Sequence, residues 1–110
     1  MAYDEELAHR IRELLSTERG VQEKAMFGGL AFLINGHMAV AVSSQGGLMV
    51  RVPRADTEVL LGRTHASPMV MAGRETRGWV RVTDDGVKTK RQLQSWTSRG
   101  VDFAKSLPAK

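Results

Sequence analysis

Residues 25–42, AMFGGLAFLINGHMAVAV, constrain the fold most strongly, because polar side chains are nearly absent and Asn35-Gly36 lies in their middle. Both central positions of a type I′ turn need a positive φ, and Asn-Gly is the dipeptide that adopts it most readily. The apolar residues on either side then form the two strands. The sequence therefore predicts a β-hairpin with a two-residue turn at Asn35 and Gly36.

A two-residue turn also predicts which residues of the two strands face each other. The expected pairs are Ile34 with His37, Leu33 with Met38, Phe32 with Ala39, Ala31 with Val40 and Leu30 with Ala41. In this register, large side chains lie opposite small ones on both faces, as close packing requires. We therefore expect a hairpin that is buried on both faces.

Gly28-Gly29, directly before the hairpin, resemble a phosphate-binding glycine loop at first sight. Such a loop leads from a strand into a helix, whose free amides bind the anion. Here the glycines lead into the predicted strand over 30–34 instead. We therefore expect a structural role for the segment Met26-Phe27-Gly28-Gly29, with a bulge or a close backbone approach at the glycines and no ligand site.

Hydrophobic spacing and helix-end signals predict the remaining elements. Leu7, Ile11 and Leu14 recur on one helical face, and Thr89 with Gln92 matches a capping box at the start of the last helix. The predicted elements begin with a helix that ends at Gly20, followed by the hairpin and a strand over 46–52. A short helix over 53–61 comes next. Two strands in 68–73 and 78–84, joined by the turn-rich residues 73–78, and a closing helix complete the order. The expected fold class is α+β, a two-layer antiparallel sheet packed with helices in the order α-β-β-β-α-β-β-α, as one domain over residues 1–110.

The residues that usually carry catalysis or bind metals are scarce or scattered. The chain has no cysteine, which excludes disulfides and thiolate sites, and His9, His37 and His65 do not have the spacing of a metal site. No serine lies in a nucleophile elbow. We therefore expect no catalytic residues, no metal and no cofactor. The acidic N-terminal residues and the lack of a long apolar run predict a cytoplasmic protein that does not insert into a membrane.

The net charge of +4 lies entirely in the second half of the chain, since residues 1–55 carry six basic and six acidic residues and residues 56–110 carry ten and six. A solvated basic face is the ordinary explanation of such a surplus. Direct binding of nucleic acid is the functional alternative. The residues that would contact phosphates are Arg74, Arg77, Arg81, Lys88, Lys90 and Arg91.

Three helices are few for covering both faces of a five-stranded antiparallel sheet, which normally leaves one face to water. Because the hairpin is apolar on both faces, we expect a second copy to cover one of them in a homodimer. A small apolar ligand over the sheet is the rival. The candidate interface residues are Leu33, Met38, Val40 and Trp79, and the alternative face is that of Leu30, Phe32 and Ile34.

The chain resembles the TfoX (Sxy) N-terminal domain family over nearly its whole length. The features that carry the resemblance are Met26-Phe27-Gly28-Gly29 before a hairpin, the strand LMVRV, Ser67-Pro68-Met69, and the closing helix with Leu93 and Trp96. The resemblance implies a fold similar to that of secretion chaperones and a link to natural competence, in which full-length members act with the cyclic-AMP receptor protein at promoters. It implies no catalytic residues. We therefore expect a stand-alone, non-enzymatic regulatory module that contacts a transcription factor or polymerase.

Overall fold

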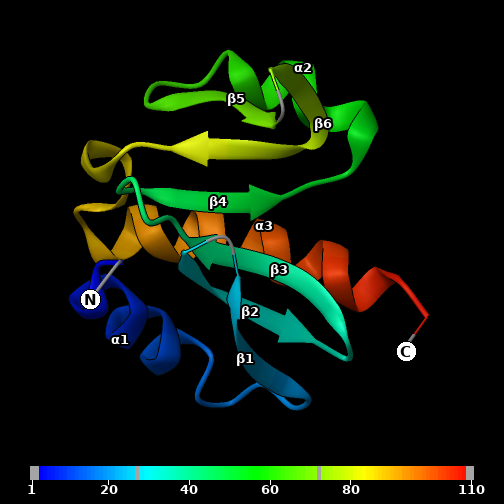
Figure 1. Ribbon diagram of the computed structural model, residues 1–110. Helices are drawn as coiled ribbons and strands as arrows, with labels where there is room; N and C mark the ends of the chain where they lie inside the picture. The colour runs from blue at the N-terminus through cyan, green and yellow to red at the C-terminus, as the bar shows by residue number, and fades with distance from the viewer. Residues whose placement is uncertain (1–2, 27, 72, 109–110) are drawn as a thin grey trace.

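The computed structural model describes residues 3–26, 28–71 and 73–108, which form one antiparallel sheet with helices packed on one side (Figure 1). The strand order across the sheet is β1-β2-β3-β4-β6-β5. The expected α+β class is confirmed. The elements are α1 (Glu5–Leu14), β1 (Val21–Met26), β2 (Gly29–Ile34), β3 (His37–Val42), β4 (Leu48–Arg51), a 3₁₀ turn (Arg54–Asp56), α2 (Thr57–Leu61), β5 (Ala66–Met71), β6 (Arg74–Val82), a second 3₁₀ turn (Asp84–Val87) and α3 (Lys90–Ser106).

The two longer helices begin at well-formed caps. Asp4 accepts a hydrogen bond from the Leu7 amide at the start of α1. The predicted capping box of α3 is confirmed, because the Thr89 hydroxyl accepts from the Gln92 amide at 3.1 Å and the Gln92 side chain accepts from the Thr89 amide at 3.0 Å. Within the described part of the chain, none of the helices combines the length and apolarity that a membrane span requires.

Helix α3 runs behind strands β3 and β4 in the view of Figure 1 and approaches them very closely. A Cβ atom at Gly100 would overlap the carbonyl oxygen of Ala39, so only glycine lets the helix backbone come this near the strand. The main core lies between this side of the sheet and the helices α1 and α3, with Phe32, Val40 and Ile11 completely buried. Helix packing therefore uses one face of the sheet.

The hairpin turn is as predicted, but the register beyond it is not. Asn35 and Gly36 have φ values of 53° and 87°, as a type I′ turn requires. The first two predicted pairs are present, but a bulge between Phe32 and Leu33 leaves Ala39 as an extra residue and changes the rest. The observed pairs are Phe32 with Val40, Ala31 with Ala41 and Leu30 with Val42. The prediction of large residues opposite small ones was therefore wrong, because a bulge shifts every later pair by one residue.

One strand of the sheet was not predicted, and another begins earlier than predicted. The sheet has a sixth strand, β1, whose residues are mostly exposed and polar and so lack the alternation that marks a half-buried strand. Strand β6 already begins at Arg74, within the stretch that was expected to be a turn. Gly78, with a φ of 92°, lies within this strand, and its amide donates to the Thr57 hydroxyl at 2.9 Å. The glycine therefore marks the place where the sheet is tied to α2.

The close backbone approach expected at Gly28-Gly29 is confirmed at the second glycine. A Cβ atom at Gly29 would overlap the carbonyl oxygen of Val42 in the neighbouring strand. Gly28 has a φ of 76°, a conformation that glycine adopts without strain. Phe27, the second residue of the predicted motif, lies outside the described residues. The described part of the segment thus fits the structural role that we predicted.

Candidate functional site

The sheet face turned away from α1 and α3 carries a second, separate apolar cluster, and we call it the open face (Figure 1). Its buried centre comes from β2, β3, β4 and β5, and its half-buried edge includes residues of β1 and β6. The cluster consists of Met26, Ala31, Leu33, Met38, Ala41, Met49, Met69 and Trp79. Four of these eight residues are methionines, whose flexible and polarisable side chains suit adaptable contact surfaces.

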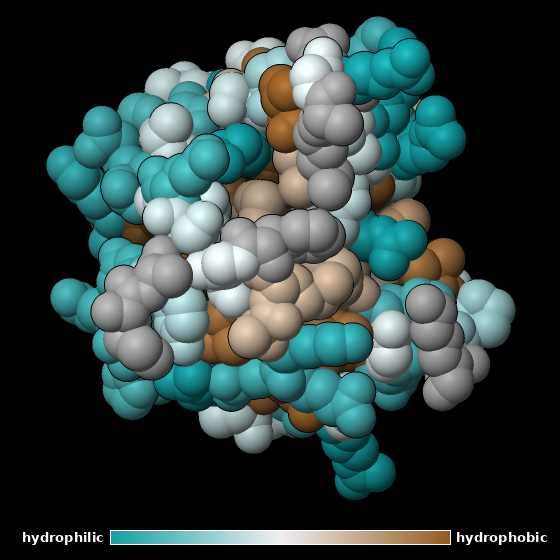
Figure 2. All heavy atoms as spheres, viewed as in Figure 1, coloured by the Kyte–Doolittle hydropathy of each residue, from teal (hydrophilic) through white to brown (hydrophobic). Residues whose placement is uncertain are grey.

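The open face has a buried centre and a more accessible edge. Ala31 and Ala41 are 0% and 4% exposed, and Met49 is 7% exposed, although no helical residue belongs to this cluster. Leu33 and Trp79 at the edge are only partly buried. Figure 2 shows apolar atoms gathered in the middle of this side of the molecule, with hydrophilic atoms around them. The open face therefore combines a buried apolar centre with half-buried apolar side chains at its edge.

Three of the four predicted interface residues lie together on this face, and the fourth does not. Leu33, Met38 and Trp79 belong to the open-face cluster. Val40 is fully buried on the opposite side, in the core beneath the helices, so its assignment to the same face was wrong. The bulge is the reason, because it places Val40 opposite Phe32. The alternative patch around Phe32 is likewise buried in that core.

The six basic residues proposed to contact nucleic acid are spread over the molecule. Arg74 and Arg77 lie in the first half of β6, whereas Arg81 lies near its other end. Lys88, Lys90 and Arg91 gather at the start of α3. Arg77 forms an ion pair with Glu58 at 2.9 Å, and Lys88 forms one with Asp85 at 3.1 Å. The structure thus brings three of the six together and leaves the other three on β6.

Arg81 lies beside the open face, since it pairs in register with Met49. Its guanidinium donates to the Gly46 carbonyl at 3.1 Å and lies 3.4 Å from the hydroxyl of Ser43. These bonds hold the side chain against the loop between β3 and β4. Arg81 is therefore a fixed part of the border of the apolar surface.

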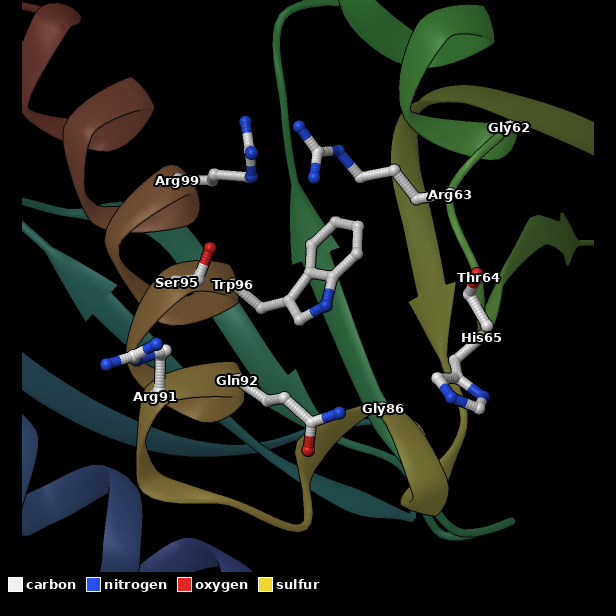
Figure 3. A pocket seen from close by; sticks show the side chains of 10 residues that line it. All are labelled: Gly62, Arg63, Thr64, His65, Gly86, Arg91, Gln92, Ser95, Trp96 and Arg99. Carbon is white, nitrogen blue, oxygen red and sulfur yellow. The ribbon is translucent and has the colours of Figure 1, made fainter.

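A basic pocket on the helix side of the molecule was not predicted (Figure 3). It has a volume of about 580 Å³ and lies between α3 and the segment 62–65 that follows α2. Three arginines line it, Arg63, Arg91 and Arg99, together with Trp96. Trp96 itself is 7% exposed and packs into the core, as its helical spacing predicted. Arg91, Ser95 and Arg99 follow one another at intervals of four residues, so this stripe could have been found in the sequence, whereas Arg63 could not.

The three histidines lie in separate environments. His9 contacts Glu13 at 3.0 Å on the surface of α1, and His37 Nε2 lies 2.6 Å from the carbonyl oxygen of Pro108. His65 lines the basic pocket. Among the described residues, no three His, Cys, Asp or Glu side chains are grouped so that they could hold a metal ion. The absence of catalytic residues stays a prediction.

One ion pair links α1 to the edge of the sheet. The Arg12 guanidinium donates two hydrogen bonds of 2.8 Å to the carboxylate of Glu23 in β1. These bonds lower the pKa of Glu23 below its ordinary range, and the same carboxylate raises the pKa of Arg12. The pair has a structural role, because it lies on the helix side of the sheet and outside both the open face and the basic pocket.

Comparison with known proteins agrees with the order of elements described above. The family model of the TfoX N-terminal domain matches residues 13–104, from within α1 to the last turns of α3. No match was found among curated proteins or among solved structures. Since the matched region takes in all six strands and most of the residues of both apolar clusters, the chain belongs to the family of TfoX N-terminal domains.

Proposed function

We propose that the chain is a non-enzymatic regulatory module of the cytoplasm, which acts through protein–protein contacts in transcription regulation and forms a homodimer through its open face. Family membership supports the regulatory role. The observation that carries the interaction is the open face itself, an apolar surface on the side of the sheet opposite α1 and α3. Its half-buried members, Met26, Leu33, Met38 and Trp79, are the residues that a partner would cover.

A second copy suits this surface for two physical reasons. Arg81, in register with Met49, flanks the cluster, so two copies can pack their apolar residues together while this charge stays at the rim of the contact. Methionine side chains can also adjust their rotamers to pack against one another. A two-fold dimer buries the same patch on both copies, and such dimers are the commonest assemblies of soluble proteins. The interface would then be richer in apolar side chains than the rest of the surface.

Sedimentation equilibrium tests this dimer, with Leu33→Glu as the interface variant. The wild type is expected to sediment with twice the 12.1 kDa mass of one chain at micromolar concentration. Leu33→Glu is expected to sediment as a single chain, because it would place a charge in the contact. Val59→Glu is the matched control, since Val59 is a 74% exposed apolar residue of α2 that does not belong to the open-face cluster. This control should remain dimeric.

Two results would contradict the proposal. A wild-type mass of one chain throughout the concentration range would exclude the homodimer and leave a different protein as the occupant of the open face. A dimer that persists in Leu33→Glu would place the interface elsewhere. Circular dichroism of both variants shows whether they are folded, so a lost dimer can be told apart from a lost structure.

Direct nucleic-acid binding is the second candidate, and the grouping of Lys88, Lys90 and Arg91 at the start of α3 favours it. The positive end of a helix adds to the attraction for phosphate. Three phosphate contacts would make the logarithm of the binding constant fall with the logarithm of the salt concentration with a slope of about −3. A binding constant for a short DNA duplex that does not change with salt would exclude this candidate.

A further inference from the structure

We propose that the basic pocket between α3 and residues 62–65 binds a small phosphorylated molecule, with the phosphate held between Arg63 and Arg99. In Figure 3 the side chains of Arg63 and Arg99 extend toward each other from opposite walls, on the same side of the Trp96 ring. Arg63 follows α2, and Arg99 belongs to α3, so two separate parts of the fold bring them together. Nothing in the open face contributes to this pocket.

The basic pocket itself has no acidic side chain among the ten residues that line it, although Arg99 also lines a neighbouring cavity together with Asp56 and Asp102. Among the described residues, the ion pairs involve Arg12, Arg77, Lys88, Lys105 and His9, and they leave out the three arginines of the pocket. Like charges held near each other repel, so an anion between Arg63 and Arg99 would relieve that repulsion. The pocket therefore favours a negatively charged ligand.

The type of side chain indicates a phosphate. Guanidinium groups are planar and donate paired hydrogen bonds that match the oxygens of phosphate or carboxylate. Two guanidiniums on opposite walls can donate to different oxygens of one tetrahedral group, whereas the oxygens of a carboxylate lie in a single plane. Arg99 is held in place, because its guanidinium lies 5.7 Å from the centre of the Trp96 ring in a cation–π contact. The contact with Trp96 thus orients the Arg99 guanidinium, one of the two groups that would bind the phosphate.

The rest of the pocket has room and hydrogen-bonding groups for the molecule that carries the phosphate. A volume of about 580 Å³ is in the range of small-molecule sites and far exceeds that of phosphate alone. Below the arginines, Gln92 extends from α3 toward the interior of the pocket, and His65 stands on the opposite wall (Figure 3). The His65 ring can form a hydrogen bond with the ligand, whereas the Gln92 side-chain amide already bonds to Thr89 and Asp85 at the start of α3.

The wall opposite α3 is firmly built. His65 has a φ of 72°, in the left-handed region, and its carbonyl accepts from the Thr83 amide at 3.0 Å. A Cβ atom at Gly86 would overlap the Cβ of His65, so this glycine allows the 62–65 segment to pack directly on the second 3₁₀ turn. This wall of the pocket is therefore held in place by contacts with Thr83 and the second 3₁₀ turn, and a fixed wall favours a preorganised binding site.

Isothermal titration calorimetry of the whole chain with AMP, phenyl phosphate and pyrophosphate, in a buffer without other phosphate or sulfate, tests the site. All three are expected to bind at micromolar to millimolar concentration, and adenosine, which lacks the phosphate, is not. Arg63→Gln is expected to weaken AMP binding by about tenfold or more, because it removes a charge-assisted contact. Arg19→Gln, an exposed arginine in the turn before β1, is the control and should bind AMP like the wild type.

Three outcomes would overturn the proposal. The first is that none of the three phosphate compounds binds at millimolar concentration, and the second is that Arg63→Gln and Arg19→Gln weaken binding equally. The third is that a short DNA duplex binds while AMP does not, which would assign the arginines to a nucleic-acid backbone. Because Arg63 is exposed, its substitution leaves the core intact, and thermal unfolding of the variant verifies this.

Discussion

Gly100 shows how a single residue sets the distance between the helix layer and the sheet. In the middle of a helix, replacing glycine by alanine ordinarily stabilises a protein by about 1 kcal/mol. Here the added methyl group would overlap the Ala39 carbonyl oxygen, a backbone atom that cannot rotate away. Overpacking of a core costs about 1–3 kcal/mol. We therefore expect Gly100→Ala to lower the free energy of unfolding by more than 1 kcal/mol, reversing the usual sign.

Urea unfolding followed by circular dichroism measures this effect. Ser98→Ala is the control, because Ser98 is exposed on the same helix and its substitution changes helix propensity without entering the core. It should leave the stability unchanged or raise it slightly. A Gly100→Ala variant that is more stable than the wild type would show that α3 does not lie against β3 as described.

At the scale of whole elements, the Arg12–Glu23 pair ties α1 to strand β1. Its hydrogen bonds lower the pKa of Glu23 in the folded state, so the pair contributes stability at neutral pH, above the ordinary glutamate range. This contribution is lost as the pH falls through the lowered value. We expect Glu23→Gln to be slightly less stable than the wild type at pH 7, and the difference to vanish in strong acid. Both side chains are partly exposed, so the effect is small.

A double-mutant cycle separates this pair from other effects of the substitutions. Arg12→Gln alone should cost about as much as Glu23→Gln, and the double variant should cost little more than either one. The free energies of unfolding at pH 7 and at strongly acidic pH are the required measurements. Additive losses at pH 7, or a difference that does not depend on pH, would mean that the two side chains do not interact in solution.

The same elements show which parts of the fold a sequence can predict. The turn at Asn35-Gly36 and the cap at Thr89 were predicted because each depends on local geometry that few residue types satisfy. Strand β1 was missed because its edge position leaves it mostly exposed, so its side chains do not alternate. The bulge at Ala39 was missed because the two-residue turn predicts only the pairs next to it, and Gly100, the neighbour of Ala39 in the fold, is far away in the sequence.

The candidate sites were predictable to different degrees for a similar reason. Leu33, Met38 and Trp79 share one face of the sheet, because alternation along a strand groups such side chains, and their role in an interface stays a prediction. Val40 was misplaced because the bulge interrupts that alternation. The basic pocket was missed because Arg63 and Arg99 come from separate segments, and only the folded chain places them opposite each other.

At the scale of the whole molecule, the two tryptophans report on opposite sides of the sheet. Trp96 belongs to the core beneath the helices, and Trp79 belongs to the open-face cluster. If the chain folds as one domain, both sides unfold together. We expect Trp79→Phe and Trp96→Phe, each with one tryptophan left, to show fluorescence transitions that coincide with the loss of circular dichroism in the same variant. Separate midpoints within either variant would reveal two cooperative units.

The two outer strands of the sheet limit how copies of this chain can assemble. Strand β1 carries charged, exposed residues such as Glu23 and Lys24, and strand β5 contains Pro68, which has no amide hydrogen to donate. Both outer strands therefore resist the lateral strand addition by which fibres grow. In a dimer formed through the open faces, neither copy has an open face left to contact a third chain. Growth then ends at two chains, so the concentration of the protein can rise without polymerisation.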